Sequence, residues 1–173
     1  MANKLFQGQV NILPDIGVPG QHMSTNPLVS AQKGYCAADT VTIGGFVWAE
    51  TVDENDAFVK STGKGAPLGF AVREITNPLG YNQPASNTVP KGFPVSVAVK
   101  GDFAVITRTS ATVGQSVFAV LADGSIKTGA EGDIVDGAIE TDYKVVNING
   151  GGAADDIIVI SNWGLMKGEK TNV

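Results

Sequence analysis

The sequence contains one histidine and one cysteine, the side chains best suited to nucleophilic or acid–base chemistry. A hydrolytic site would have to combine His22 with Ser24 or with Cys36. His22 lies in a proline-rich stretch, and no nucleophile elbow flanks its potential partners. We therefore interpret His22 as an exposed or interface residue and Cys36 as a small packed side chain. We predict that the protein is not an enzyme.

Carboxylates form three short groups, at residues 53–56, at Asp133 and Asp136, and at Asp155 and Asp156. Such oxygens bind hard cations, but none of the groups has the spacing of an EF-hand. Solvated turns account for these residues, with an ordering calcium ion as the alternative. We predict no cofactor and no metal centre.

Two tryptophans could stack against sugar rings, because aromatic faces on a β-sandwich suit pyranoses. Trp48 lies within an apolar stretch, which favours core packing, whereas the sequence leaves both roles open for Trp163. A carbohydrate-binding β-sandwich module of a phage or cell-surface protein is therefore the alternative function.

Residues 137–143, Gly-Ala-Ile-Glu-Thr-Asp-Tyr, resemble the uracil-binding hairpin of trimeric dUTPases. The match covers only that hairpin, and Glu140 stands where the family has aspartate. The Arg-Ser-Ser motif and the glycine-rich arm of that family are absent from the sequence. We reject this activity for the chain.

The composition indicates one β-rich domain. The chain has 173 residues, is 43% hydrophobic with a mean hydropathy of +0.09, and contains 22 glycines and 8 prolines. This length supports one core, and frequent turn residues are typical of all-β chains.

Charge and hydropathy limit the partners. The net charge is −5, and the lysines and arginines are dispersed, which argues against nucleic acid. No apolar run approaches the roughly 18 residues that a membrane span needs, and the N-terminus lacks a signal-peptide pattern. A lone cysteine excludes an intrachain disulfide and suits a reducing compartment.

Short apolar segments separated by glycine and aspartate predict the strands. Val95, Val97 and Val99 alternate with smaller or polar residues, and the turn at Gly101 predicts a hairpin over residues 94–107. A second hairpin is predicted over residues 116–127. The other predicted strands are 41–48, 68–73, 143–148 and 157–161. This spacing favours an all-β fold, a jelly-roll-like β-sandwich or barrel.

The first part of the chain differs from the rest. Prolines at positions 14, 19 and 27 exclude a helix or a long central strand, yet the segment carries many apolar residues. We predict an extended N-terminal arm over residues 1–35, a β-sandwich domain over 36–165 and a C-terminal tail over 166–173. The arm residues expected to contact a partner protein or another subunit are Leu5, Phe6, Ile12, Leu13, Ile16, Val18, Asn26 and Pro27.

A series of motifs resembles the structural cement proteins, or capsid decoration proteins, of tailed bacteriophages. The order of the motifs carries the resemblance rather than any single one. The motifs are Gly-Val-Pro-Gly at 17–20, Ser-Thr-Asn-Pro at 24–27, Gly-Phe-Val-Trp-Ala at 45–49, Pro-Leu-Gly-Phe-Ala-Val-Arg at 67–73, Pro-Lys-Gly-Phe-Pro-Val at 90–95, Gly-Asp-Phe at 101–103, Thr-Val-Gly-Gln at 112–115 and Ala-Asp-Gly at 122–124. The part after Gly129 resembles the family least.

The resemblance implies a virion structural protein of the phage head. It implies a jelly-roll β-protein that binds the outer surface of an icosahedral shell, bridges major capsid protein subunits, and has no catalytic activity. We expect the arm to bind by adding to sheet edges, with many copies acting together. We also expect a homodimer, because a self-complementary pair bridges two-fold positions. The expected location is the capsid exterior, after assembly in the host cytoplasm.

Overall fold

The computed structural model describes residues 17–52, 55–74, 87–148 and 151–164 of the chain. Within these ranges the chain forms fourteen β-strands and no helix. Many turns between the strands contain a glycine with positive φ, such as Gly44, Gly92 and Gly124. The predicted all-β class is confirmed, and the jelly-roll arrangement stays a prediction.

Most of the strands are short. In chain order they are β1 (Val29–Ser30), β2 (Tyr35–Ala37), β3 (Val41–Thr42), β4 (Phe46–Val52), β5 (Asn55–Lys60), β6 (Gly69–Ala71), β7 (Thr88–Val89), β8 (Pro94–Val95), β9 (Val97–Lys100), β10 (Asp102–Ile106), β11 (Ser116–Val120), β12 (Ile126–Gly129), β13 (Ala138–Asn147) and β14 (Ile157–Ser161).

The first sheet, with the order β1-β9-β6-β4-β5-β2-β8, closes on itself. β8 and β9 are parts of one extended stretch, separated only by Ser96. β8 pairs with β2 through Val95 and Tyr35, whereas β9 pairs with β6 through Ala98 and Phe70. This stretch therefore joins the two ends of the sheet. The space that the sheet encloses holds one apolar core, to which the short β3–β7 pair also contributes.

The second sheet has the order β10-β14-β13-β11-β12, with every pair of strands antiparallel. The chain that follows β10 returns to the far end of this sheet. Thr107 forms a parallel bridge with Ile126 of β12, and the Arg108 N–H donates to the Ile126 carbonyl over 2.7 Å. The second sheet is thus closed in the same way as the first.

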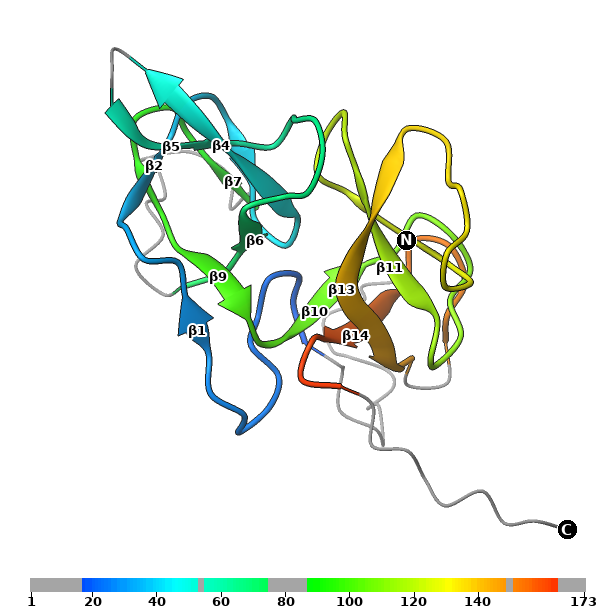
Figure 1. The fold of residues 1–173 in the computed structure, drawn as a ribbon. Helices are drawn as coiled ribbons and strands as arrows, with labels where there is room; N and C mark the ends of the chain where they lie inside the picture. Colours follow the sequence, from blue (N-terminus) through cyan, green and yellow to red (C-terminus); the bar gives the residue numbers. More distant parts are fainter. Residues whose placement is uncertain (1–16, 53–54, 75–86, 149–150, 165–173) are drawn as a thin grey trace, which may run out of the picture.

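The two sheets lie side by side and share the second apolar core (Figure 1). Phe46 and Phe70 enter this core from the first sheet, and Phe103 and Tyr143 enter it from the second. The rings of Phe70 and Phe103 stack across the boundary, with centroids 4.4 Å apart and an angle of 19°. Aromatic packing therefore holds the sheets together.

The predicted hairpin over residues 94–107 is wrong, because β9 and β10 belong to different sheets. Gly101 is the corner where the chain crosses between them. A Cβ atom at Gly101 would lie 2.5 Å from the Phe103 ring, so the crossing requires glycine. The predicted hairpin over residues 116–127 is confirmed as the β11–β12 pair.

Candidate functional site

The N-terminal part of the described chain, residues 17–31, runs across both sheets, and we call it the strap. Its middle pairs with the outer edge of β10: the Gly20 N–H donates to the Ala104 carbonyl over 2.8 Å, and the Ala104 N–H donates to the Gln21 carbonyl over 3.0 Å. Its end forms β1, which pairs with β9 (Figure 1). The strap therefore connects the two sheets and fixes the point where residues 1–16 join the described chain.

Two glycines allow the strap to lie close to the first sheet. Gly20 and Gly44 both have a φ of +85°, a conformation that other residues rarely adopt. A Cβ atom at Gly20 would lie 2.6 Å from Cγ2 of Ile43, and one at Gly44 would lie 3.0 Å from the Gly20 nitrogen. The Gly20 carbonyl also accepts the Arg73 N–H over 2.8 Å. The backbone of the strap is therefore in direct contact with the backbone of the first sheet and its turns.

Asp102 fastens the strap from the side of the second sheet. Its side chain is buried, and its Oδ2 accepts hydrogen bonds from the Ser24 hydroxyl and from the Asn26 amide, the latter over 2.7 Å. Burial raises the pKa of Asp102, but hydrogen bonds from Ser161, Ser24 and Asn26, together with the nearby His22, outweigh burial and lower the pKa below its usual value. Asp102 is therefore a carboxylate at neutral pH.

This cluster positions the strap and forms no nucleophilic site among its described side chains. The Ser24 hydroxyl donates to Asp102 rather than to His22. His22 forms a β-bridge with Phe103, and their ring centroids lie 6.0 Å apart. Cys36 lies on β2, in the other sheet. A hydroxyl or thiol activated by imidazole does not arise from this geometry.

The structure places three of the eight predicted contact residues. Val18 is 45% exposed, Pro27 is exposed, and the Asn26 side chain binds Asp102 within the chain. The other five lie outside the described residues: Leu5, Phe6, Ile12, Leu13 and Ile16. Within the predicted arm over residues 1–35, the part from Gly20 onward is hydrogen-bonded to the two sheets.

The loop between β12 and β13, residues 130–137, is a second surface feature, and the sequence reasoning missed it. β12 and β13 pair with opposite edges of β11, so the loop must cross one face of β11. Phe118 of β11 is fully buried although it belongs to neither apolar core. A Cβ atom at Gly129 would meet the Phe118 ring at 3.2 Å and Val135 of the loop at 3.8 Å. The loop therefore covers Phe118.

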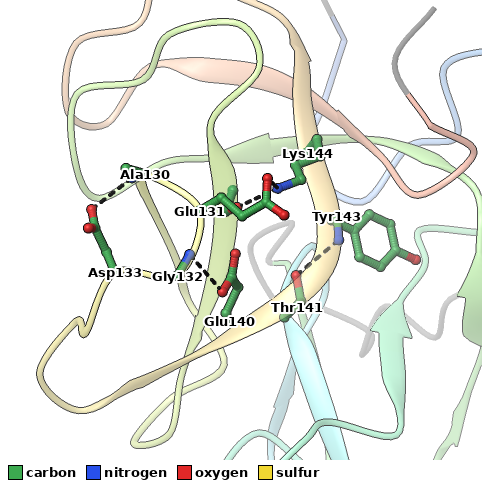
Figure 2. A network of polar contacts seen from close by, with 9 residues as sticks. Ala130, Glu131, Gly132, Asp133, Glu140, Thr141, Tyr143 and Lys144 are labelled. Carbon is green, nitrogen blue, oxygen red and sulfur yellow. Dashed lines mark hydrogen bonds and ion pairs between the residues drawn. The ribbon is translucent and has the colours of Figure 1, made fainter.

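Polar contacts hold the loop in place (Figure 2). The Ala130 N–H donates to the Asp133 carboxylate over 2.8 Å, which closes the first turn of the loop. The Gly132 N–H donates to the carboxylate of Glu140 on β13 over 3.1 Å. These contacts tie the loop both to itself and to the strand that follows it.

Lys144 on β13 provides a further tie to the same loop (Figure 2). Its ammonium group lies 3.1 Å from the carboxylate of Glu131 and donates to the Ser116 hydroxyl over 2.7 Å. A hydrogen bond with Ser116 lowers the pKa of Glu140; the Gly132 N–H and Lys144 act in the same direction, and partial burial opposes them. Glu140 therefore stays ionised and keeps its bond to the loop.

The two tryptophans have different surroundings. Trp48 is buried in the shared core, and its indole N–H donates to the Gly65 carbonyl over 2.9 Å. Trp163 is 40% exposed, and the Lys100 ammonium lies 5.1 Å from the centre of its ring. Trp48 therefore packs as predicted, and Lys100 covers part of the exposed Trp163.

Several of the grouped carboxylates have structural partners. Asp155 forms an ion pair with Arg108 over 2.8 Å, and Asp156 accepts the N–H groups of Gly152 and Ala153, each over 3.0 Å. In the described ranges, no three His, Cys, Asp or Glu side chains gather as metal ligands. The same part of the chain has no helix with the length and apolar character that crossing a membrane requires.

Comparison with known proteins gives one family and a related fold. Residues 6–162 match the family model described as XM1 gp53 minor capsid protein. A chain from the solved capsid of Myoviridae phage XM1 superimposes with a TM-score of 0.59 at 15% identity, covering 91% of this chain and 97% of that chain. No curated protein matches the sequence. At this identity the superposition establishes a shared fold, whereas the family model covers nearly the whole chain.

Proposed function

The chain belongs to the XM1 gp53 minor capsid protein family, and we propose on that premise that it binds the outer surface of an icosahedral phage capsid and bridges major capsid protein subunits. Family membership makes it a capsid-associated structural protein of the virion. The proposal adds a location on the capsid exterior, after assembly in the host cytoplasm. It includes no catalytic step and no cofactor.

The observation that carries this proposal is the anchorage of the strap. A segment that links two proteins resists their separation only if it is firmly attached to the folded part of its own chain. Backbone hydrogen bonds hold the strap to β10 and to Arg73, and side-chain bonds hold it to Asp102. Tension on residues 1–16 would therefore pass to both sheets together.

The binding energy is proposed to come from the apolar residues of the arm. Leu5, Phe6, Ile12, Leu13 and Ile16 would each contribute on the order of 1 to 2 kcal/mol if buried against a capsid subunit, before the cost of ordering the arm is subtracted. Val18, which follows them in the sequence, is exposed. Many copies on one shell would then act together, because each further contact becomes intramolecular.

We also propose that the protein acts as a homodimer, since a self-complementary pair can bridge two capsomers at a two-fold position. Analytical ultracentrifugation over a range of concentrations tests this part separately. A protein that is monomeric at all concentrations and is present as single copies on the shell would contradict the homodimer. This result would not contradict capsid binding, which is tested separately.

The experiment compares three proteins for binding to capsids assembled without this chain: the full-length protein, a deletion of residues 1–16 and a deletion of residues 1–26. The shorter deletion should melt like the full-length protein but dissociate from capsids on mild heating. The longer deletion should also melt at a lower temperature, because it removes Ser24 and Asn26 from Asp102 and uncovers the edge of β10.

The two deletions separate binding from folding. Retention of the 1–16 deletion equal to that of the full-length protein would remove the arm from the mechanism. Failure of the full-length protein to bind capsids at all would refute the proposed function.

A further inference from the structure

The β12–β13 loop presents an apolar side chain to solvent in an unusual way. Ile134 is 100% exposed, whereas Val113, the next most exposed large apolar residue in the described ranges, is 55% exposed. Burying an isoleucine side chain against a partner is favourable, so a fully exposed isoleucine can contribute to binding. Single exposed apolar residues are common on protein surfaces, but the loop holds Ile134 in a defined position.

The loop is ordered before any partner arrives. The loop covers the buried Phe118, while Asp133 and Glu140 accept N–H groups from its backbone. A side chain on such a loop loses little conformational entropy when it is buried by a partner. The arrangement therefore favours Ile134 as a preformed contact rather than as a residue of a loose connection.

The charges around the loop define the partner. The stretch from residue 127 to residue 144 has five carboxylates and two lysines: Glu131, Asp133, Asp136, Glu140, Asp142, Lys127 and Lys144. Lys144 pairs with Glu131, and Lys127 donates to the backbone carbonyl of Asp136 over 3.4 Å. The outer rim of the loop is thus acidic. A second copy of this chain, with net charge −5, would on balance be repelled by it.

We propose that Ile134 and its acidic rim dock on the capsid shell protein, with Ile134 in an apolar pocket bordered by lysine or arginine side chains. This inference rests on the proposed function and adds to it a contact separate from the arm. The apolar contact gives affinity, and the complementary charges give orientation. Two separate contacts on one molecule are also what bridging requires.

The test measures binding of full-length variants to capsids assembled without this chain. Ile134→Ala should weaken binding by about 10-fold and Ile134→Asp by about 100-fold, as expected for losing a buried isoleucine and for placing a charge in its pocket. The melting temperature should not change, because Ile134 contributes nothing to the folded core. Val113→Asp is the matched control, and it should bind like the wild type.

The acidic rim is tested by salt and by Asp136→Lys. Asp136 is exposed and contacts Lys127 through its backbone carbonyl only, so its side chain can be changed without loosening the loop. Asp136→Lys should weaken capsid binding, and its binding should depend less on salt concentration than that of the wild type.

The outcomes separate this inference from the proposed function. If the full-length wild type binds capsids and both Ile134 variants bind equally well, the docking loop is refuted and the proposed function stands. If Val113→Asp weakens binding as much as Ile134→Asp, the loop has no special role. If the Ile134 variants change the oligomeric state but not capsid binding, the partner is a second copy and the shell assignment is wrong. Absence of wild-type binding overturns both proposals.

Discussion

Asp102 shows how one residue can decide the role of a segment. In the sequence it follows Gly101 in the Gly-Asp-Phe motif, at the turn predicted between two strands. In the fold it is buried and receives Ser24 and Asn26 from the strap. The Ser-Thr-Asn-Pro motif at residues 24–27 therefore has an intramolecular role, because two of its side chains bind this carboxylate.

The lowered pKa of Asp102 predicts a dependence of stability on pH. Since the folded-state pKa lies below that of the unfolded chain, ionised Asp102 stabilises the fold at pH values above the unfolded pKa of about 4, and this contribution disappears as the pH falls through the folded-state value. Asp102→Asn should lower the free energy of unfolding at pH 7 by about 1 to 3 kcal/mol. Urea unfolding from pH 7 to pH 2.5 should show the two proteins converging. A constant difference over that range would contradict this role.

Val97 and Val99 form a matched pair for testing the register of β9. Alternation predicts that both point to the core, but Val97 is 5% exposed and Val99, nearer the corner, is 38% exposed. Val97→Asp should destabilise the fold by about 3 to 5 kcal/mol, because it places a charge in the enclosed core of the first sheet. Val99→Asp should shift the melting temperature only slightly. Equal shifts for the two variants would show that the register is different.

At the level of elements, the sequence predicted local structure better than strand partners. The hairpin of residues 116–127 is correct because its turn joins two strands of one sheet. The predicted hairpin of residues 94–107 is wrong because β10 enters another sheet. The alternation and the turn at Gly101 would look the same in the sequence if β10 paired with β9. Only the buried aspartate and the packing of Phe103 against Gly101 distinguish the two cases, and both depend on distant residues.

The sequence does contain a signal for the cover that the β12–β13 loop provides. Val117, Phe118 and Ala119 are consecutive apolar residues in β11, and such a run indicates a strand that is covered on both faces. One face meets the shared core, and the loop provides the other cover. The exposure of Ile134, by contrast, follows from the loop's path and is not encoded locally.

The contact between Gly20 and Gly44 predicts that these positions tolerate no side chain. Gly20→Ala combines a strained φ of +85° with a Cβ 2.6 Å from Ile43, so it should cost more than strain alone, which is about 1 to 3 kcal/mol. Gly92→Ala is the control, because Gly92 has a φ of +83° and open space around its Cβ position. Differential scanning calorimetry of both variants separates the two effects. An equal loss would mean that the strap does not lie close to Gly44.

For the whole molecule, the closure of both sheets suits a protein that must bind one partner and avoid others. Each sheet joins its two ends through a neighbouring stretch of chain, and the strap covers the outer edge of β10. Long open edges, which promote aggregation by strand pairing, are thus removed from the described part of the chain. Binding is left to specific features of the surface, among which we place the arm and Ile134.

The shared aromatic core predicts that the two sheets unfold as one unit. Phe46 and Phe70 of the first sheet pack against Phe103 and Tyr143 of the second, so neither sheet keeps its core if the other is lost. In a Trp163→Phe variant, fluorescence of the buried Trp48 reports on the first sheet while far-UV circular dichroism reports on both.

The two signals should share one urea midpoint, and Phe70→Ala should lower that midpoint for both by an amount that corresponds to about 3 to 5 kcal/mol. Loss of the Trp48 signal before that of the circular dichroism would instead show two independent units. The strap would then still link the two units beside the chain crossing at Gly101, because its hydrogen bonds reach β10 on one side and β9 on the other.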